Sequence, residues 1–327
     1  MKKSILFILA GVIITLLFFV IQGSITGDNS NTAGDNSDYN QNNFQEIYTP
    51  PMPEELTFCG SPVPTNLYYV RESFERELIA NCYLHGTTLQ IIKRAQRYFP
   101  VIEPILKKNR IPDDMKYLAV AESGLRNVVS PAKAEGIWQF MKETGKEYGL
   151  EVNNEVDERY HLEKATQAAC DYLNKSYKIF DDWALVAAAY NAGNSRILDF
   201  TSKQVSTDYF NLLTSTETSR YVYRIIALKC ILEDPLKYGF YIRENEIYPI
   251  IPAETVTVDT TINSLVDFAL GNEISYMVLK EFNPWLRSTS LPNKSGKKYE
   301  IALPKKGYLD YNKKLKESND RSWFTGY

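Results

Sequence analysis

Glu122 is the residue whose position in this sequence most strongly suggests chemistry. It lies in the stretch LAVAESGLRN, four residues after Leu118 and three after Ala119, so a helix would place it on the same face as these apolar side chains. Burial disfavours the charged carboxylate and raises its pKa, so a buried glutamate can stay protonated near neutral pH and donate a proton. Glu122 is therefore a candidate catalytic acid. The alternative is a side chain that reaches solvent at the helix end.

The residues around Glu122 predict the helix that would position it. Pro112 suits the first turn of a helix, and Asp113 and Asp114 complement the positive end of the helix dipole. Gly124 marks the end of the helix. The sequence thus predicts a short helix with Glu122 in its last turn.

Three short segments follow one another in order: AESGL at 121–125, GIWQF at 136–140 and AYNAG at 189–193. Each is a weak signal alone, but the ordered set resembles the lysozyme-like lytic transglycosylases of glycoside hydrolase family 23. The resemblance covers residues 66–241, more than half of the chain. It implies a lysozyme-like helical domain that cleaves the bond between N-acetylmuramic acid and N-acetylglucosamine in peptidoglycan glycan strands, and it implies no cofactor.

A glycosidase that uses water usually carries a second carboxylate as nucleophile or base, and no obvious partner for Glu122 stands out. The resemblance explains this gap. In the family one glutamate acts first as acid and then as base, while the C6 hydroxyl of N-acetylmuramic acid attacks its own C1 to give a 1,6-anhydro sugar. Positioning of this hydroxyl replaces the second carboxylate. The alternatives are a hydrolytic muramidase, with Glu217 as its second carboxylate, and a non-catalytic cell-wall-binding protein.

The resemblance also implies a set of substrate-binding residues. Gly136 permits a close backbone approach, and Gln139 can donate to and accept from a sugar. In AYNAG, Tyr190 would hold the reacting region, and Asn191 would contact the substrate or the neighbours of Glu122. The full expected set is Ser123, Ser130, Gly136, Ile137, Gln139, Tyr190, Asn191, Glu217 and Tyr221.

Three residues in these segments also have a purely structural interpretation. Trp138 fits the core, which we favour, or a platform that stacks on a sugar ring. Tyr190 fits a buried tyrosine whose hydroxyl is satisfied. Glu217, in TETSRYV before Tyr221, fits either a cleft residue or the glutamate of a capping box that begins at Thr214.

The segment VVSPAKAEG departs from the family pattern. It is one residue shorter than in many relatives, and Lys133 stands where glycine is common. Ser130 occupies the place of a family serine that hydrogen-bonds toward the site, so the departure bears on the geometry of Ser130.

The composition limits the classes of protein to consider. The chain has 327 residues, of which 44% are hydrophobic, enough for one or two packed domains. The formal net charge of −3 gives no basic surplus for a polyanion, so we expect no nucleic-acid partner. Two histidines and the lack of a C-x-x-C pair predict no metal site. The sequence identifies no protein partner. The spacing of the cysteines does not determine the pairing of Cys59, Cys82, Cys170 and Cys230.

The N-terminus predicts export. The lysines of MKK precede an uncharged apolar run at 5–21, which is longer than a typical signal-peptide core and short for a full span. No clean A-x-A cleavage site follows it. We therefore favour an uncleaved signal anchor at 1–25, at the periplasmic face of the inner membrane, over a cleaved signal peptide that leaves the chain in the periplasm. The Asn- and Ser-rich stretch at 26–60 is typical of a disordered linker.

Beyond the linker the pattern becomes helical. Apolar residues recur at three-to-four spacing and no strand is evident, so residues 61–245 are predicted to form one lysozyme-like helical domain in a mostly α protein. Its last helix is predicted to end before Pro235.

Residues 253–305 predict a small α+β module of strand, helix, helix and strand. SLVDFA at 264–269, LKEFNPWL at 279–286 and YEIALP at 299–304 resemble LysM, a module that binds glycans containing N-acetylglucosamine. The usual Gly-Asp-Thr turn after the first strand is replaced by DTTIN, so glycan binding and a purely structural module both stay open. Residues 306–327 form a polar tail.

Overall fold

A computed structural model describes residues 47–243 and 246–310. The described residues from Thr49 onward belong to one compact unit. The predicted signal anchor, most of the predicted linker and most of the polar tail lie outside the described residues. Within the described ranges, no helix has the length and apolar character needed to cross a membrane.

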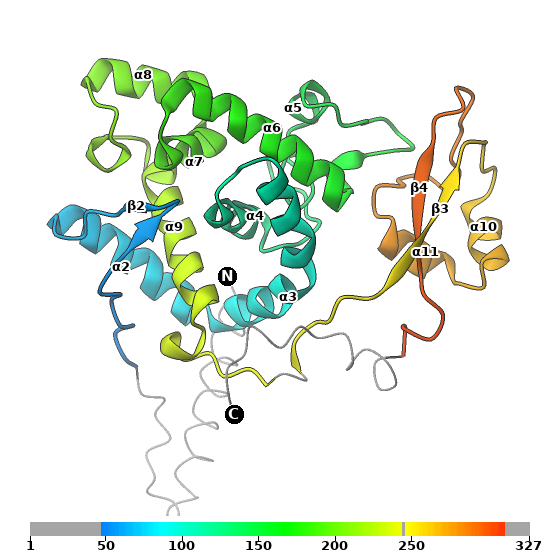
Figure 1. Ribbon diagram of the computed structural model, residues 1–327, viewed down its shortest axis with the longest axis horizontal. Coiled ribbons are helices and arrows are strands. Elements are labelled where there is room, and N and C mark those ends of the chain that lie inside the picture. Colours follow the sequence, from blue (N-terminus) through cyan, green and yellow to red (C-terminus); the bar gives the residue numbers. More distant parts are fainter. Residues whose placement is uncertain (1–46, 244–245, 311–327) are drawn as a thin grey trace, which may run out of the picture. The chain divides into compact units, whose positions relative to one another are not determined.

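The part of the chain that was predicted to be helical is helical (Figure 1). A short antiparallel hairpin corrects two predictions: β1 (Thr57–Phe58) lies in the stretch predicted to be a disordered linker, and β2 (Ser61–Pro62) lies in the domain predicted to have no strand. From residue 67 to residue 241, the described residues form β-pairs only as isolated bridges, which agrees with the absence of a strand pattern. The α-helices are α2 (Tyr68–Tyr83), α3 (His85–Lys108), α4 (Lys116–Ser123), α5 (Lys142–Glu147), α6 (Leu162–Phe180), α7 (Trp183–Ala192), α8 (Asn194–Gln204) and α9 (Thr216–Glu233). Short 3₁₀ turns are η1 (Asp113–Met115), η2 (Glu158–Tyr160), η3 (Tyr209–Asn211) and η4 (Leu236–Tyr238).

Helix α4 packs against both α3 and α9 in the helical domain (Figure 1). Pro112 directly precedes η1, which leads into the helix, as predicted. Leu118 and Ala119 are fully buried, so they form the inward face. Gly124 ends the helix in the left-handed conformation at φ +60°, which glycine adopts without strain. The predicted helix is confirmed, and Glu122 lies in its last turn.

Helix α9 begins one residue later than predicted. The cap is Ser215, whose side-chain oxygen accepts a hydrogen bond from the backbone N–H of Thr218 at 3.3 Å. The prediction that Thr214 starts a capping box was wrong, because Glu217 is then the second helical residue and not the third. Adjacent serine and threonine offer the same hydroxyl, so the sequence alone could not select between them. The helix ends before Pro235, as predicted.

The C-terminal module has the predicted order of elements: β3 (Ala253–Val258), α10 (Leu265–Gly271), α11 (Tyr276–Phe282) and β4 (Tyr299–Pro304). The strands pair antiparallel, with Ala253 opposite Pro304 and Val258 opposite Tyr299. Ser264 and Ser275 cap the two helices through their side-chain oxygens. A compact apolar cluster, which contains the fully buried residues Leu265, Leu279, Leu286 and Ile301, holds the sheet and helices together.

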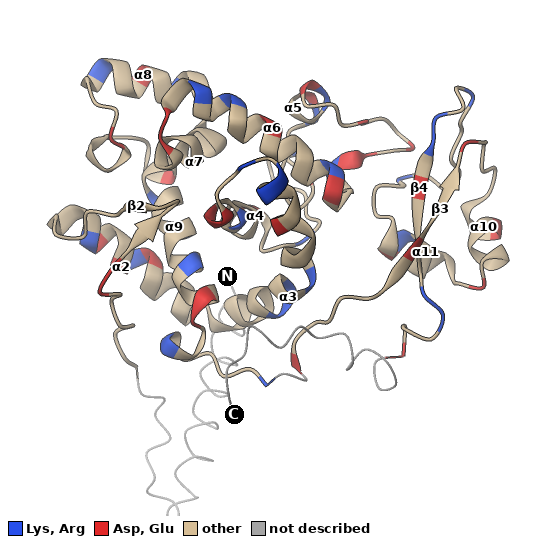
Figure 2. Ribbon diagram, in the orientation of Figure 1, with Lys and Arg blue, Asp and Glu red and all other residues tan. Residues whose placement is uncertain are grey.

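Acidic and basic side chains are interspersed along the helices and strands (Figure 2). In the view of Figure 2 neither sign collects into a continuous stripe along one element. This distribution agrees with the small formal net charge of −3.

Candidate active site

Glu122 is held by a residue that lies far away in the sequence. The hydroxyl of Tyr221, on α9, donates a hydrogen bond to Oε1 of Glu122 at 2.5 Å. Tyr221 is itself buried. The Glu122 side chain is half-buried, so it remains partly accessible to solvent, as a group that must touch a ligand requires. The carboxyl group is therefore fixed in one orientation by a neutral donor.

The surroundings of Glu122 make it a weak acid. Burial disfavours the charged form and raises the pKa of its carboxyl group from 4.5 to about 7. The hydrogen bond from Tyr221 and the positive charge of Arg224 oppose this rise, while the negative charge of Glu217 adds to it. Glu122 can consequently hold a proton at neutral pH and can also give it up, as a residue that alternates between acid and base must.

Residues 135–140, which contain the GIWQF motif, lie against the helix that carries Glu122, and we call them the wall. Ser123 donates from its hydroxyl to the backbone oxygen of Ile137 at 2.8 Å. Tyr190 donates from its hydroxyl to the backbone oxygen of Trp138 at 2.7 Å. The two side chains thus fix consecutive peptide groups of the wall, one from α4 and one from α7.

Trp138 is a core residue, as we favoured from the sequence. Its side chain is fully buried, and its ring N–H donates to Oγ1 of Thr166 on α6 at 2.9 Å. The ring meets that of Tyr190 edge-on at a centroid distance of 6.4 Å. A buried ring with a satisfied N–H is no platform for a sugar, so the indole shapes the wall from behind.

Gly136 is required by a close contact. Its φ is +83°, and a Cβ atom placed there would lie 2.0 Å from the backbone oxygen of Arg159. The close backbone approach that was predicted for Gly136 is therefore present, and its partner is the segment before α6. Gln139 has φ +52°, and its Nε2 donates to the backbone oxygens of Val128 at 2.9 Å and Gly136 at 2.7 Å. The Gln139 amide nitrogen holds the turn of the wall.

Tyr190 and Asn191 end α7 beside the acid. Burial raises the pKa of the Tyr190 hydroxyl well above 10, and the neighbouring charge of Glu122 raises it further. Tyr190 is therefore a neutral donor at physiological pH. Oδ1 of Asn191 accepts a hydrogen bond from the hydroxyl of Thr218 at 3.2 Å, so it ties α7 to the first turn of α9.

Two expected site residues have other principal contacts. Ser130 accepts a hydrogen bond from the backbone N–H of Ala134 at 2.9 Å, within its own turn. In the same turn Lys133 has φ +66°, which explains why glycine would suit that position. Glu217 is 62% exposed in its side chain and forms an ion pair with Arg224 at 3.3 Å. Its influence on Glu122 is electrostatic.

The sequence analysis missed Glu77 and Arg224. Glu77, on α2, is only 1% exposed and forms ion pairs with Arg220 at 2.7 Å and Arg224 at 3.6 Å. These arginines flank Tyr221 on α9, so Glu77 anchors the helix that supplies the hydroxyl to Glu122. A usable signal was present, because Glu77 lies on the apolar face of its helix beside Leu78, as Glu122 does on its own.

No group of histidine, cysteine and acidic side chains suited to hold a metal occurs in the ranges 47–243 and 246–310. Each of the four cysteines that were considered for disulfides is a free thiol in the structure. What the site assembles is a carboxyl group with a raised pKa, a neutral hydrogen-bond donor on it, and a wall of fixed peptide groups beside it.

Comparisons with known proteins identify the two domains. Residues 99–212 match the family model of the transglycosylase SLT domain, and residues 254–307 match that of the soluble lytic transglycosylase C-terminal LysM-like domain. The chain carries an SLT transglycosylase domain followed by a LysM-like domain. Both predictions made from short motifs, a lysozyme-like domain and a LysM-like module, are confirmed.

The chain is also similar to two curated proteins, both called membrane-bound lytic murein transglycosylase D, from Escherichia coli strain K12 and Escherichia coli O6:H1. In each case the identity is 31% over 243 residues, which is 72% of this chain and 52% of the relative. The chain therefore spans about half the length of the curated relatives it matches.

Proposed function

We propose that this chain is a peptidoglycan lytic transglycosylase. It cleaves the β-1,4 bond between N-acetylmuramic acid and N-acetylglucosamine without water and leaves 1,6-anhydro ends. The observation that carries the proposal is Glu122, half-buried with a pKa of about 7, held by the Tyr221 hydroxyl next to the wall. The SLT domain match supports the same reaction class.

In the first step the protonated carboxyl of Glu122 gives its proton to the glycosidic oxygen, and the bond from that oxygen to C1 breaks. Positive charge develops at C1 as the leaving sugar departs, and the substrate N-acetyl group helps to stabilise it. The Glu122 carboxylate that results accepts the short hydrogen bond from Tyr221, which stabilises the negative charge as it forms.

In the second step the same carboxylate acts as base. It removes the proton from the C6 hydroxyl of N-acetylmuramic acid while O6 bonds to C1, which closes the anhydro ring and restores the protonated acid. One residue serves both steps because a pKa of about 7 balances donation and acceptance near neutral pH. No second carboxylate is needed, and Glu217 is engaged with Arg224.

The wall would bind the sugar through its peptide groups. Ser123 and Tyr190 fix the carbonyl groups of Ile137 and Trp138, so the neighbouring backbone of the wall is held in place before the substrate arrives. In this proposal Gly136 and Gln139 line the same surface, and Asn191, Ser130, Glu217 and Tyr221 surround the bound sugar.

The proposed location is the periplasmic face of the inner membrane. The apolar run at 5–21, which lies outside the described residues, supports an anchor or a signal peptide. The names of the two relatives describe membrane-bound proteins. The LysM-like domain supports peptidoglycan as the polymer that the chain meets.

Mass analysis of the products tests the proposal. The purified full chain, in detergent, is incubated with peptidoglycan, and the soluble fragments are identified. Ends of 1,6-anhydro-N-acetylmuramic acid, absent with Glu122→Gln, are expected. Reducing ends, heavier by one water, would instead show a hydrolase with a second carboxylate. Absence of product from folded protein that sediments with the polymer would show a binding protein.

A further inference from the structure

We propose that the LysM-like domain is docked on the helical domain as a fixed part of the enzyme, and that residues 151–161 transmit this docking to the wall of the active site. We call these residues the docking segment. They lie between α5 and α6 and contact the module on one side and the wall on the other. Only the effect on turnover rests on the proposed function.

The apolar core of the module is completed by the helical domain. Val156, which is 1% exposed, and Tyr160 belong to the same buried cluster as Leu279, Leu286 and Ile301 of the module. A domain that swings on a linker keeps its own core closed. A valine from one domain inside the core of another indicates a permanent contact, because separation would expose apolar surface on both sides.

Backbone hydrogen bonds fix the orientation of this contact. The N–H of Asp157 donates to the backbone oxygen of Trp285 at 2.9 Å, and the N–H of Arg287 donates to that of Glu155 at 2.7 Å. Val156 and Leu286 thereby form an antiparallel bridge. Paired main chains have one register, so the module has one orientation on the segment.

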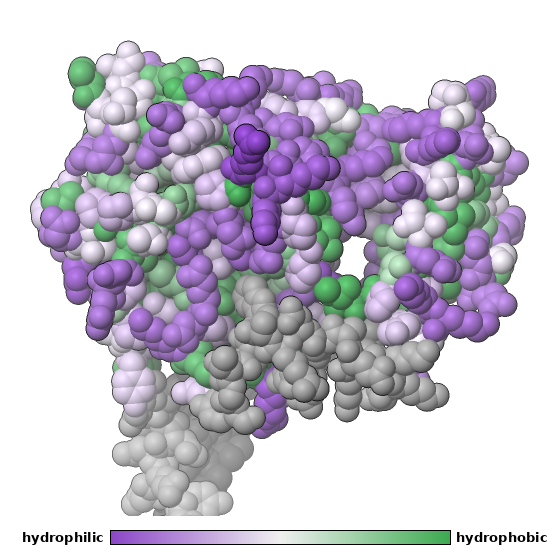
Figure 3. All heavy atoms as spheres, in the orientation of Figure 1, coloured by the Kyte–Doolittle hydropathy of each residue, from purple (hydrophilic) through white to green (hydrophobic). Residues whose placement is uncertain are grey.

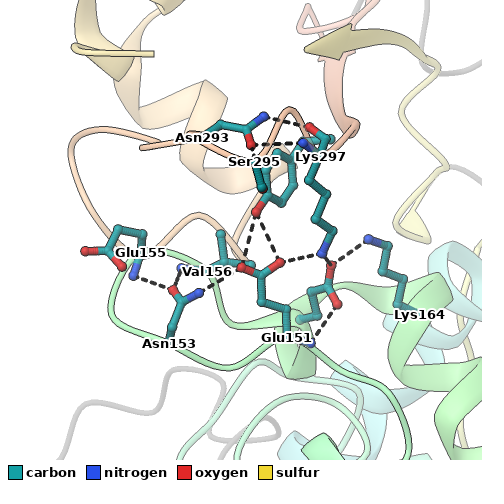
Figure 4. A network of polar contacts seen from close by, with 10 residues as sticks. Glu151, Asn153, Glu155, Val156, Lys164, Asn293, Ser295 and Lys297 are labelled. Carbon is teal, nitrogen blue, oxygen red and sulfur yellow. Dashed lines mark hydrogen bonds and ion pairs between the residues drawn. The ribbon is translucent and has the colours of Figure 1, made fainter. Parts of the chain in front are cut away.

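Charged groups from both domains meet beside this bridge (Figure 4). Lys297 of the module forms ion pairs with Glu151 and, at 3.5 Å, with Glu158. Glu158 is 3% exposed, and Lys164 also pairs with it at 2.6 Å. The hydroxyl of Tyr299 donates to Glu151 at 3.1 Å. A buried carboxylate is tolerated only when it is paired, so Glu158 ties the segment to cations of both domains.

Each side of the contact is braced by hydrogen bonds within itself. On the segment, Oδ1 of Asn153 accepts hydrogen bonds from the backbone N–H groups of Glu155 and Val156 at 2.9 and 2.7 Å (Figure 4). On the module, the amide of Asn293 bonds both the backbone N–H and the backbone oxygen of Lys297. Turns braced by their own side chains lose less conformational freedom on docking, which favours the contact.

Aromatic groups add a third kind of contact. Trp285 stacks on His161 at a centroid distance of 5.7 Å and on Tyr299 at 5.8 Å. The guanidinium of Arg287 lies 4.3 Å from the ring centroid of Tyr160, within cation–π range. Apolar, backbone, ionic and aromatic contacts therefore coincide on a single short segment.

The same segment supports the wall. The Asp157 carboxylate holds the guanidinium of Arg159, with oxygen–nitrogen distances of 2.6 and 2.9 Å. Arg159 in turn donates to the backbone oxygen of Phe140 at 3.2 Å and pairs with Glu135 at 3.1 Å. Its backbone oxygen fits against Gly136. A continuous path of contacts thus leads from the module, through Asp157 and Arg159, to the wall.

A cavity of about 470 Å³ lies beside the docking segment. Ile137 of the wall and Asn127 line it from the helical domain, and Thr255, Glu300 and Ala302 line it from the module sheet. The space-filling view shows an opening in the same region, between the helical domain and the module (Figure 3). The two domains are therefore not in contact along their whole length. Substitutions at the segment should suffice to release the module.

Hydrogen exchange on the full chain in detergent, followed by mass spectrometry, tests the docking without a substrate. The informative variant is Lys297→Glu, which places a carboxylate against Glu151 and Glu158. The matched control is Lys306→Glu, shortly after β4, which reverses the charge of the cation in an exposed ion pair with Glu273 of the module. In Lys297→Glu, amides of the docking segment and of 284–288 should exchange at least about tenfold faster, and those of the wall should follow. The control should match wild type.

Two further readouts keep the test decisive. The strands at 253–258 and 299–304 report whether the module itself stays folded, and Val156→Asp provides a second way to break the contact. Unprotected amides of Asp157 and Arg287 in the wild-type chain, with both domains folded, would overturn the docking. Protection of the wall that stays unchanged when the segment opens would overturn the transmission. If the proposed function holds, Lys297→Glu should also lower kcat/KM several-fold relative to Lys306→Glu.

Discussion

Glu122 is a half-buried carboxylate and Glu158 a fully buried one, yet their pKa values shift in opposite directions. For Glu158, burial alone would raise the pKa, but the hydrogen bond from Lys164, the backbone N–H of Glu151 and the charge of Lys297 bring it below 4.5. For Glu122, burial prevails and the pKa rises to about 7. The difference teaches that partners decide the charge state: cations and N–H groups keep Glu158 an anion, and a neutral hydroxyl leaves Glu122 able to hold its proton near neutral pH.

The largest expected effect is the loss of activity when Glu122 is replaced. Glu122→Gln keeps the shape but removes the transferable proton, so release of anhydro-muropeptides should fall by at least about a thousandfold. Product analysis by mass spectrometry measures the fall, and circular dichroism shows that the fold is kept. Activity near that of the wild type in this variant would remove Glu122 from the mechanism.

The second prediction concerns Gly136, where the wall meets the docking segment. Gly136→Ala places a methyl group 2.0 Å from the Arg159 carbonyl oxygen, so the free energy of unfolding should fall by about 4 kcal/mol. Gly149→Ala is a matched control, because its φ is also positive, at +85°, and no atom lies within 4 Å of the added carbon. It should lose only about 1 kcal/mol. Urea denaturation distinguishes them, and equal losses would show that strain in φ, not the contact, requires Gly136.

The third prediction concerns the contribution of the buried Glu158 carboxylate to stability. Glu158→Gln leaves Lys164 and Lys297 without their buried partner, so stability at pH 7 should fall by about 3 kcal/mol. The pKa of Glu158 is lowered in the folded protein, so its contribution is present above the unfolded value near 4.5 and is lost as pH falls through the folded pKa. Wild type and variant should converge in acid. A stability difference that persists at low pH would point to packing and not to charge.

The fourth prediction is that ionisation of Glu122 has the opposite effect on stability to ionisation of Glu158. The pKa of Glu122 is raised on folding, so ionising it costs stability as pH rises from 4.5 through about 7. At pH 8 the free energy of unfolding of Glu122→Gln should therefore exceed that of the wild type by about 2 kcal/mol, a value that allows for the partial exposure of Glu122. This difference should vanish near pH 4. Thermal unfolding at both pH values measures it. A variant less stable than wild type at pH 8 would contradict the raised pKa.

The smallest effect concerns the hydroxyl that distinguishes the two sites. Tyr221→Phe removes the donor to Glu122 while keeping the buried ring, and kcat should fall by about ten- to thirtyfold. Because this hydrogen bond lowers the pKa of Glu122, its loss should move the alkaline limb of the pH–activity profile upward. Tyr223→Phe, also on α9, is the control. An alkaline limb that does not move in Tyr221→Phe would show that Tyr221 contributes only through packing.

Short-range patterns in the sequence determined much of this protein. The helix before Gly124, the place of Glu122 on its apolar face, and the strand–helix–helix–strand order of the module depend on periodicity and on caps within a few residues. Such features are set by residues that are neighbours in the chain. They could therefore be predicted, and the motif order predicted the domains.

Tertiary structure alone decided what these elements meet. The Tyr221 hydroxyl comes to Glu122 from 99 positions along the chain, and Glu77 anchors its helix from still farther away. The contact of Gly136 with Arg159 and the docking segment's place in the module core also join distant parts. These pairings depend on how whole helices pack, and each local pattern is compatible with many packings. The sequence therefore predicted Glu122 as the candidate acid, while the fold selected the groups that surround its carboxyl group.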